Sequence, residues 1–117
     1  MLLRPGWAED APALARALRG EARSPNAWSD ALADAEAFLA APDDPTLPRF
    51  LVTLRTAGAP LVIGTCGLTR SAAGHVDLHC WIDEQHRGLG FAAEARRALS
   101  DIAMTLGQHP LEVQLAA

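Results

Sequence analysis

Apolar and polar residues alternate along the middle of the chain. In Arg49–Arg55 and Val76–Ile82 every second residue is apolar, which is the period of a β-strand with one buried face. Leu61–Leu68 is almost continuously apolar or small, as expected for a strand covered on both faces. The links Thr56–Pro60 and Ser71–Gly74 contain glycine and suit hairpin turns. The pattern therefore predicts three consecutive antiparallel strands.

Three other segments repeat apolar residues at the period of an amphipathic helix. The first is Ala8–Leu18, which we expect to stop at Gly20, and the second is Ser29–Ala41, which ends before Pro42. The third is expected to begin at the glycine pair around Gly88. Its predicted inner face consists of Leu89, Ala92, Ala93, Leu99, Ile102, Ala103 and Leu106.

The two ends of the chain complete the expected order of elements. Met1–Pro5 predicts a short edge strand and Leu111–Leu115 a last strand. Because a helix separates the last two strands, we expect them to run parallel. The fold class is therefore α+β, a central mixed but mostly antiparallel sheet flanked by helices. At this length we expect a single domain over residues 1–117.

Composition and charge exclude several classes of partner and mechanism. The formal net charge of −4 argues against a general nucleic-acid partner. We find neither an apolar run long enough for a membrane nor a signal peptide, so we expect a cytoplasmic protein with no membrane partner. Cys66 and Cys80 fall within apolar strand-like runs and are interpreted as small buried hydrophobes, and no Cys/His spacing predicts a metal. The chain has no Lys and no Tyr, which excludes mechanisms that need either side chain.

Gly88 and Gly90 stand between the alternating run Val76–Ile82 and the third helix. The first turn of a helix leaves backbone N–H groups without partners and carries partial positive charge, so this position predicts an anion site. Glycine lets a phosphate approach the backbone closely, and Arg87 would add a cation. The alternative is a purely structural turn. The standard dinucleotide and P-loop motifs are absent.

The pattern Gln85-x-x-Gly88-x-Gly90 resembles the acyl-CoA-binding signature Q/R-x-x-G-x-G/A of the GNAT superfamily of N-acetyltransferases. It lies where that family places it, between the fourth strand and the third helix. The run from Trp81 to Ala95 and the opening Leu3-Arg4-Pro5 are similar to the branch that acetylates the N-termini of ribosomal proteins. The resemblance implies a GNAT-like acyl-CoA N-acyltransferase fold over nearly the whole chain.

The resemblance also implies a ligand and a reaction. Backbone amides from about Arg87 to Phe91 would hold the pyrophosphate of acetyl-CoA, the co-substrate, and the backbone of Trp81 and Ile82 would pair with its pantetheine arm. A primary amine, either a protein N-terminus or a small molecule, would attack the acetyl thioester directly in a ternary complex. The expected coenzyme-binding residues are Trp81, Ile82, Gln85, Arg87, Gly88, Leu89, Gly90 and Phe91.

The sequence departs from the family after its fifth strand, where relatives add a helix and two strands. We therefore expect a fold truncated after that strand, either as a fragment, or completed by another chain, or reduced. An unpaired edge on the last strand predicts a possible homodimer. Because of this departure, one alternative function is a non-catalytic, shortened acyl-CoA-binding or interaction module. A second alternative, based on the glycine turn alone, is the binding of a different phosphorylated nucleotide.

Asp77 and His79 are the candidate catalytic residues. They share one face of the fourth strand, next to the expected thioester, and either could remove a proton from the amine. Polar residues on a half-exposed strand face are also what any surface strand shows. Trp81 lies on the same face and could line a pocket or pack in the core. Arg96 and Arg97 could meet the coenzyme's 3′-phosphate, with a solvated helix face as the alternative.

Overall fold

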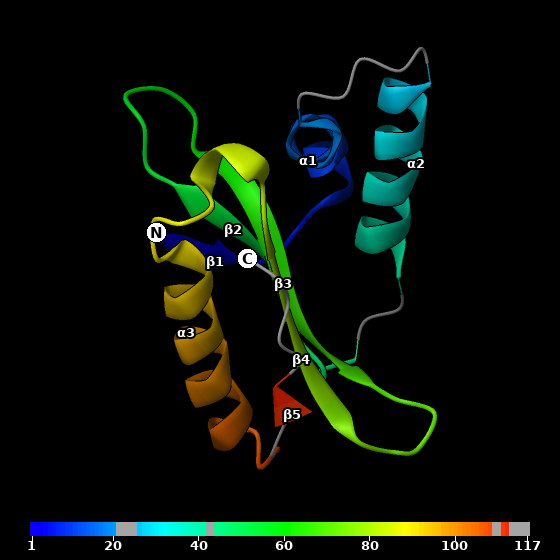
Figure 1. Ribbon diagram of the computed structural model, residues 1–117. Coiled ribbons are helices and arrows are strands. Elements are labelled where there is room, and N and C mark those ends of the chain that lie inside the picture. The colour runs from blue at the N-terminus through cyan, green and yellow to red at the C-terminus, as the bar shows by residue number, and fades with distance from the viewer. Residues whose placement is uncertain (21–25, 42–43, 109–110, 113–117) are drawn as a thin grey trace.

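The computed structural model describes residues 1–20, 26–41, 44–108 and 111–112, which form a five-stranded sheet with helices on both faces (Figure 1). No helix in these ranges is long and apolar enough to cross a membrane. The elements, with 3₁₀ turns written η, are β1 (Leu2–Arg4), η1 (Ala8–Asp10), α1 (Ala11–Arg19), α2 (Ala27–Ala40), β2 (Arg49–Leu54), β3 (Leu61–Arg70), β4 (Val76–Ile82), η2 (Glu84–His86), α3 (Phe91–Thr105) and β5 (Leu111–Glu112).

The strands lie in the order β1-β2-β3-β4-β5, and neighbours pair antiparallel except for β4 and β5. These last two run parallel, with Asp77 opposite Leu111 and Leu78 opposite Glu112. The predicted mixed, mostly antiparallel sheet and the parallel last pair are therefore confirmed. The remainder of the predicted last strand, 113–115, lies outside the described residues, so the dimer through its edge stays a prediction.

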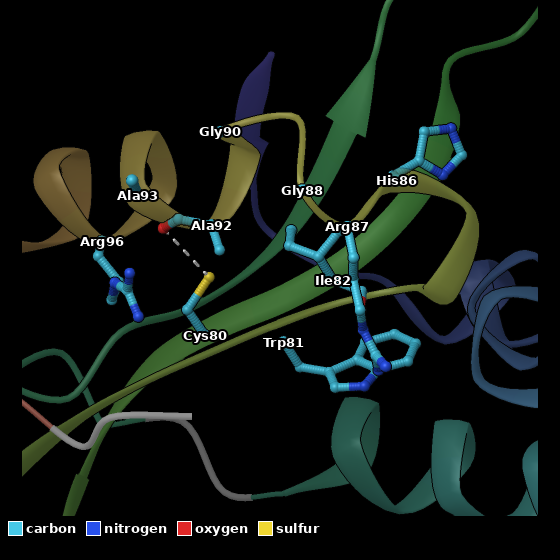
Figure 2. A pocket seen from close by; sticks show the side chains of 10 residues that line it. All are labelled: Cys80, Trp81, Ile82, His86, Arg87, Gly88, Gly90, Ala92, Ala93 and Arg96. Atoms are coloured by element: carbon cyan, nitrogen blue, oxygen red, sulfur yellow. Dashed lines mark hydrogen bonds between the residues drawn. The ribbon is translucent and has the colours of Figure 1, made fainter. Parts of the chain in front are cut away.

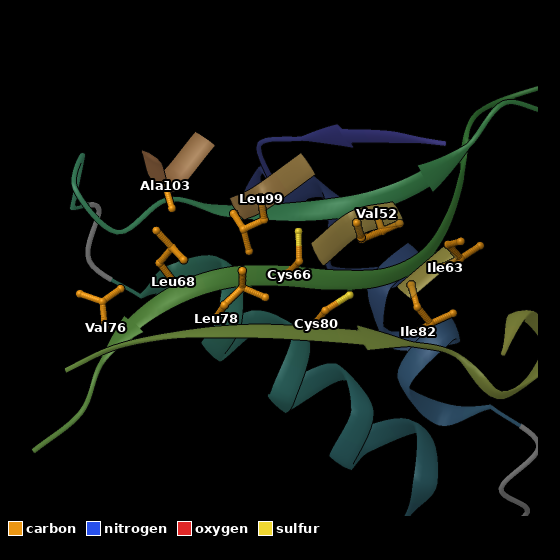
Figure 3. Close-up of a cluster of buried hydrophobic side chains, with 11 residues drawn as sticks. Val52, Ile63, Cys66, Leu68, Val76, Leu78, Cys80, Ile82, Leu99 and Ala103 are labelled. Carbon is orange, nitrogen blue, oxygen red and sulfur yellow. The ribbon is translucent and has the colours of Figure 1, made fainter. Parts of the chain in front are cut away.

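The sheet separates two layers of helix, α3 on one face and α1 with α2 on the other (Figure 1). Ala11, Leu14 and Ala15 of α1 pack with two alanines of α2 against Leu51 and Val62 of the sheet. The other face carries the larger apolar cluster (Figure 3), which consists of Val52, Ile63, Cys66, Leu68, Val76, Leu78, Cys80, Ile82, Ala95, Leu99 and Ala103. Because β3 contributes to both clusters, its prediction as a strand covered on both faces is confirmed.

The alternation predicted for β4 is also confirmed. Val76, Leu78, Cys80 and Ile82 are buried, and the residues between them, Asp77, His79 and Trp81, are only half-buried. Since neighbouring residues of a strand point to opposite faces, Asp77, His79 and Trp81 project from the face opposite α3. This alternation separates the candidate base from the helix that carries the glycine turn.

The first helix begins differently from its prediction. The turn η1 precedes α1, and the Asp10 carboxylate forms two hydrogen bonds with the Arg4 guanidinium, at 2.8 and 3.0 Å. The same carboxylate accepts the backbone N–H of Trp7 at 2.7 Å. Asp10 therefore connects the end of β1 to the start of α1. The predicted stop at Gly20 is confirmed, since this residue is the C-cap with φ +57°.

The inner face predicted for α3 is wrong at both ends and at Ala93, which is exposed. Leu89 is 63% exposed and lies in the turn, because Gly88 and Gly90 on either side of it adopt positive φ angles that a helix cannot contain. Leu106 follows the last residue of the helix and is 42% exposed. The apolar period continues past both ends of α3, whereas the backbone leaves the helical conformation.

Candidate active site

A cavity of about 300 Å³ lies where β4 ends and α3 begins. Its wall comes from the last residues of β4, from the glycine turn and from the first two turns of α3 (Figure 2). The residues that line it are Cys80, Trp81, Ile82, His86, Arg87, Gly88, Gly90, Ala92, Ala93 and Arg96.

The turn into α3 depends on two glycines. Gly88 has φ +77° and Gly90 has φ +85°, in the left-handed region where other residues are strained. A Cβ atom at either position would meet no protein atom within 4 Å. Glycine is therefore required by the backbone conformation, and the space beside both residues belongs to the cavity.

The first turn of α3 presents free amides to this space. Gly90 is the N-cap, and no side chain caps the helix. The first helical hydrogen bond joins the N–H of Glu94 to the carbonyl oxygen of Gly90 at 3.1 Å. Within the described residues, the N–H groups of Phe91, Ala92 and Ala93 therefore have no acceptor. Free amides at the positive end of a helix dipole form an anion-binding site.

The turn η2, just before the glycines, is held by Asp83. Its Oδ1 accepts the backbone N–H of His86 at 3.0 Å and lies 2.5 Å from Nδ1 of the same residue. Asp83 is only 8% exposed, because this short turn uses its carboxylate as the N-cap. The ring of His86 is thereby fixed in the cavity wall, 6.3 Å from the ring of Phe91.

Arg87 has a second role besides the predicted contact with an anion. Its Nε donates a hydrogen bond to the carbonyl oxygen of Ile82 at 2.9 Å, and its side chain extends along the end of β4 (Figure 2). The guanidinium therefore lines the cavity while it ties the turn to the strand.

The edge of β4 can be assigned from its hydrogen bonds with β3. Asp83 N–H donates to Ile63 O at 2.7 Å beyond one end of the ladder, and Ser71 N–H donates to His75 O at 2.8 Å beyond the other. Hydrogen-bonded pairs alternate with non-hydrogen-bonded pairs, and the register between the two ends has no shift. Thr65 and Trp81 are therefore a hydrogen-bonded pair, whereas the backbone groups of Cys80 and Ile82 face away from β3.

This alternation corrects one expectation. The backbone of Trp81 faces β3 and is used in the sheet, so it does not fit the expected pairing with a pantetheine arm. The outward-facing backbone of Ile82 does fit it, and that of Cys80 joins it as the next outward residue.

The thiol of Cys80 lies in the cavity wall and donates a weak hydrogen bond to the carbonyl oxygen of Ala92, with a sulfur-to-oxygen distance of 3.8 Å (Figure 2). Burial raises the pKa of Cys80, and the positive charge of Arg96 opposes that rise. Burial, with a smaller contribution from Cys80, raises the pKa of Cys66 to about 12. Both cysteines are buried, as predicted from their apolar surroundings.

The candidate bases lie elsewhere. Asp77 and His79 are half-buried on the other face of β4, and neither lines the cavity. No group of three or more potential metal ligands occurs among the described residues. A catalytic role for Asp77 or His79 therefore requires that the two substrates meet at the edge of β4.

Five of the eight expected coenzyme-binding residues line the cavity, namely Trp81, Ile82, Arg87, Gly88 and Gly90. Gln85 and Leu89 are exposed outside the lining, and Phe91 packs against the larger apolar cluster. Of the two arginines considered for the 3′-phosphate, Arg96 lines the cavity and Arg97 does not; the sequence prediction did not include Cys80, His86, Ala92 and Ala93. The helical spacing of Ala92 and Arg96 was the available signal, because residues four apart share one face.

Comparison with known proteins identifies the class. The family model described as an acetyltransferase (GNAT) domain matches residues 1–117, so the chain belongs to the GNAT acetyltransferase family. Among solved structures, the chain resembles a ribosomal-protein-alanine N-acetyltransferase from Brucella melitensis biovar Abortus 2308. That match has 19% identity and a TM-score of 0.62, and it covers 100% of this chain and 83% of the other, which establishes a common fold. A search of curated proteins gives no match.

Proposed function

We propose that this protein transfers the acetyl group of acetyl-CoA to a primary amine, by direct attack of the amine in a ternary complex. The observation that carries the proposal is the uncapped first turn of α3, where the amides of Phe91, Ala92 and Ala93 meet the cavity beside Gly88 and Gly90. A diphosphate is an anion that such a turn can hold without any metal ligand from the protein. Membership of the GNAT acetyltransferase family supports coenzyme A as its carrier.

The remaining cavity residues suit the other parts of the coenzyme. Arg96 adds a cation one turn along the helix from the free amides, on the wall where a phosphate would lie. The outward-facing backbone of Cys80 and Ile82 offers amide and carbonyl groups to the pantetheine arm, in the manner of an added strand. During binding, the Nε of Arg87 would exchange its bond with the Ile82 carbonyl for a bond with the ligand.

The chemistry follows from the two faces of β4. The lone pair of the neutral amine attacks the carbonyl carbon of the thioester, and the C–S bond breaks with its electron pair going to the thiolate of coenzyme A. The nitrogen then loses a proton to Asp77 or His79, directly or through water. Since these side chains project from the face opposite α3, the amine approaches from the α1 side and the coenzyme from the α3 side.

The acceptor we propose is an amine at a protein N-terminus or on a small molecule. The solved relative is named for an alanine of a ribosomal protein, which makes an alanine-starting peptide the first acceptor to test. A small primary amine serves as the comparison, because it offers the same nucleophile without the peptide.

Calorimetric titration with acetyl-CoA, coenzyme A and ATP tests the binding step. We expect both coenzyme forms to bind more tightly than ATP, and tighter binding of ATP would overturn the proposal. Release of coenzyme A thiol in the presence of the peptide or the small amine tests the transfer step. Tight coenzyme binding without transfer to any acceptor would favour the non-catalytic binding module.

A further inference from the structure

Cys66 and Cys80 lie directly opposite each other on adjacent strands. They are Cα partners in the register of β3 and β4, and both side chains belong to the apolar cluster under α3 (Figure 3). Neither cysteine has a disulfide partner in this structure. The pair lies in the middle of the ladder, where the strands are held on both sides.

The kind of pair decides whether a disulfide can form. The hydrogen bonds at both ends of the ladder make Thr65 and Trp81 a hydrogen-bonded pair, so Cys66 and Cys80 are a non-hydrogen-bonded pair. Opposite residues in such pairs have Cα atoms about 4.5 Å apart, inside the range of roughly 4.4–6.8 Å found across disulfides. Their Cβ atoms must approach slightly for the bond to form, which is typical of a strained and readily reduced disulfide.

Access to the pair is one-sided. Both thiols are nearly buried, Cys80 at 4% and Cys66 at 2% exposed, but Cys80 lines the cavity and Cys66 does not. The Cys80 thiol is held by a weak bond to Ala92 O. A disulfide whose sulfur enters the cavity therefore reaches Cys80 first, and Cys66 can then attack only from behind it. This is the arrangement of an attacking and a resolving thiol.

We propose that Cys80 and Cys66 form a redox couple in the wall of the coenzyme cavity, oxidised by the disulfide form of coenzyme A. The inference rests on the proposed coenzyme site, because the same cavity would bring the pantetheine sulfur to Cys80.

The exchange proceeds in two balanced steps. The Cys80 thiol loses its proton to solvent, its sulfur attacks one sulfur of coenzyme A disulfide, and coenzyme A leaves as a thiolate that takes up a proton. The Cys66 thiol then gives up its proton, its sulfur attacks the sulfur of Cys80 in the mixed disulfide, and the bond from Cys80 to coenzyme A breaks; the leaving coenzyme A thiolate takes up a proton. The two cysteines are oxidised together, and one coenzyme disulfide is reduced to two thiols. While coenzyme A is bound to Cys80, the cavity is occupied and acetyl-CoA is excluded.

The charges around the pair set its rate. Burial raises the pKa of Cys80 and so disfavours the thiolate, while the positive charge of Arg96 in the cavity wall favours it. We therefore expect slow exchange at neutral pH that becomes faster as pH rises.

Intact-protein mass spectrometry tests the proposal on the wild-type chain and on Cys66→Ser and Cys80→Ser. With coenzyme A disulfide, we expect the wild type to lose two hydrogen atoms, Cys66→Ser to keep one coenzyme A as an adduct, and Cys80→Ser to remain unmodified. Hydroxyethyl disulfide is the neutral comparison reagent. Because the cavity raises the local concentration of the coenzyme form, we expect the coenzyme reagent to react faster by on the order of tenfold.

Each deviation has its own meaning. An adduct on Cys80→Ser, or no disulfide in the wild type with either reagent, would overturn the redox couple. Equal rates with both reagents would overturn coenzyme A disulfide as the oxidant. If coenzyme A itself does not bind the reduced protein in calorimetry, the proposed function fails, and reaction with hydroxyethyl disulfide still decides whether the two cysteines pair.

Discussion

The carbonyl oxygen of Gly90 accepts the backbone N–H of Glu94 at 3.1 Å, and this is the first hydrogen bond within α3. The three amides before Glu94 depend on something outside the helix. Gly90 controls their direction, because its φ of +85° sets the angle at which the chain enters α3. The affinity for a ligand held by these amides should therefore depend on the backbone conformation of Gly90.

Replacing Gly88 or Gly90 by alanine tests this coupling. Alanine at a positive φ costs roughly 1–2 kcal/mol of stability, and its Cβ would occupy the space into which a phosphate must come. We expect each variant to bind coenzyme A at least about tenfold more weakly in calorimetry, equivalent to about 1.4 kcal/mol.

Gly74→Ala is the matched control, since Gly74 has φ +87° with open space around it but lies in the turn between β3 and β4. Its stability loss in denaturant unfolding should equal that of the other two variants, with coenzyme affinity unchanged. Unchanged affinity in both Gly88→Ala and Gly90→Ala would mean that the turn is only structural.

Arg96 and Arg97 provide a test of the charge in the cavity. Arg96 is half-buried and lines the cavity, whereas its neighbour Arg97 is exposed outside it. Arg96→Gln should weaken coenzyme A binding by roughly 1.5–3 kcal/mol and reduce its dependence on salt, because one charge-assisted contact is lost. Arg97→Gln removes the same charge from the protein and should change neither quantity. Equal effects of the two substitutions on affinity would show that only the general charge of α3 matters.

Asp77 and His79 can be separated from coenzyme binding by kinetics. If either side chain removes the proton from the amine, Asp77→Asn or His79→Gln should lower kcat roughly 100-fold. KM for acetyl-CoA should stay the same, because neither residue lines the cavity. His75→Gln, in the exposed turn before β4, is the control. Full kcat in both Asp77→Asn and His79→Gln would remove both residues from the mechanism.

Most of the sheet could be predicted because burial has a simple period in it. The apolar–polar alternation of Leu78, His79 and Cys80 matches their burial in the structure, since neighbouring residues of a strand point to opposite faces. The start of α3 could not be read in the same way. Leu89 continues the helical period, but the positive φ angles of the glycines beside it exclude a helix there.

The glycine turn of the site could be predicted from the sequence, whereas the walls of the cavity could be predicted only in part. Gly88 and Gly90 follow from a local motif, as a helix N-terminus that accepts an anion is built from consecutive residues. Arg96 could be named as a candidate from its place on the helix, whereas Cys80 joins it in the cavity wall only because α3 packs on that face of β4. The role of Asp83 is hidden in the sequence for a related reason, since nothing in its neighbours indicates that its buried carboxylate would cap η2.

The pair of Arg4 and Asp10 predicts how the protein responds to acid. Hydrogen bonding to Arg4 is the main cause that lowers the pKa of Asp10 below its ordinary value of 3.8. The stabilisation is therefore present above about pH 4 and is lost as pH falls through the lowered pKa. Asp10→Asn should cost about 1–3 kcal/mol at neutral pH and flatten the acid limb of the unfolding curve. Glu9→Gln, at an exposed neighbour, should do neither. An unchanged acid limb in Asp10→Asn would contradict the assignment.

The alkaline limb of stability depends on Cys66. The sequence has no Lys and no Tyr, so the cysteines are the side chains that titrate above pH 8 and below the range of Arg. In the unfolded chain Cys66 loses its proton near its ordinary value of 9.0, whereas burial in the folded protein raises its pKa to about 12. The folded state thus binds more protons between these values, and its free energy of unfolding should fall as pH rises through that range, by at most about 1.4 kcal/mol per pH unit for this thiol. Cys66→Ala should reduce this slope even if it lowers stability at neutral pH. Equal slopes for the two proteins in denaturant unfolding at pH 9–11 would show that Cys66 is not the buried thiol that the structure describes.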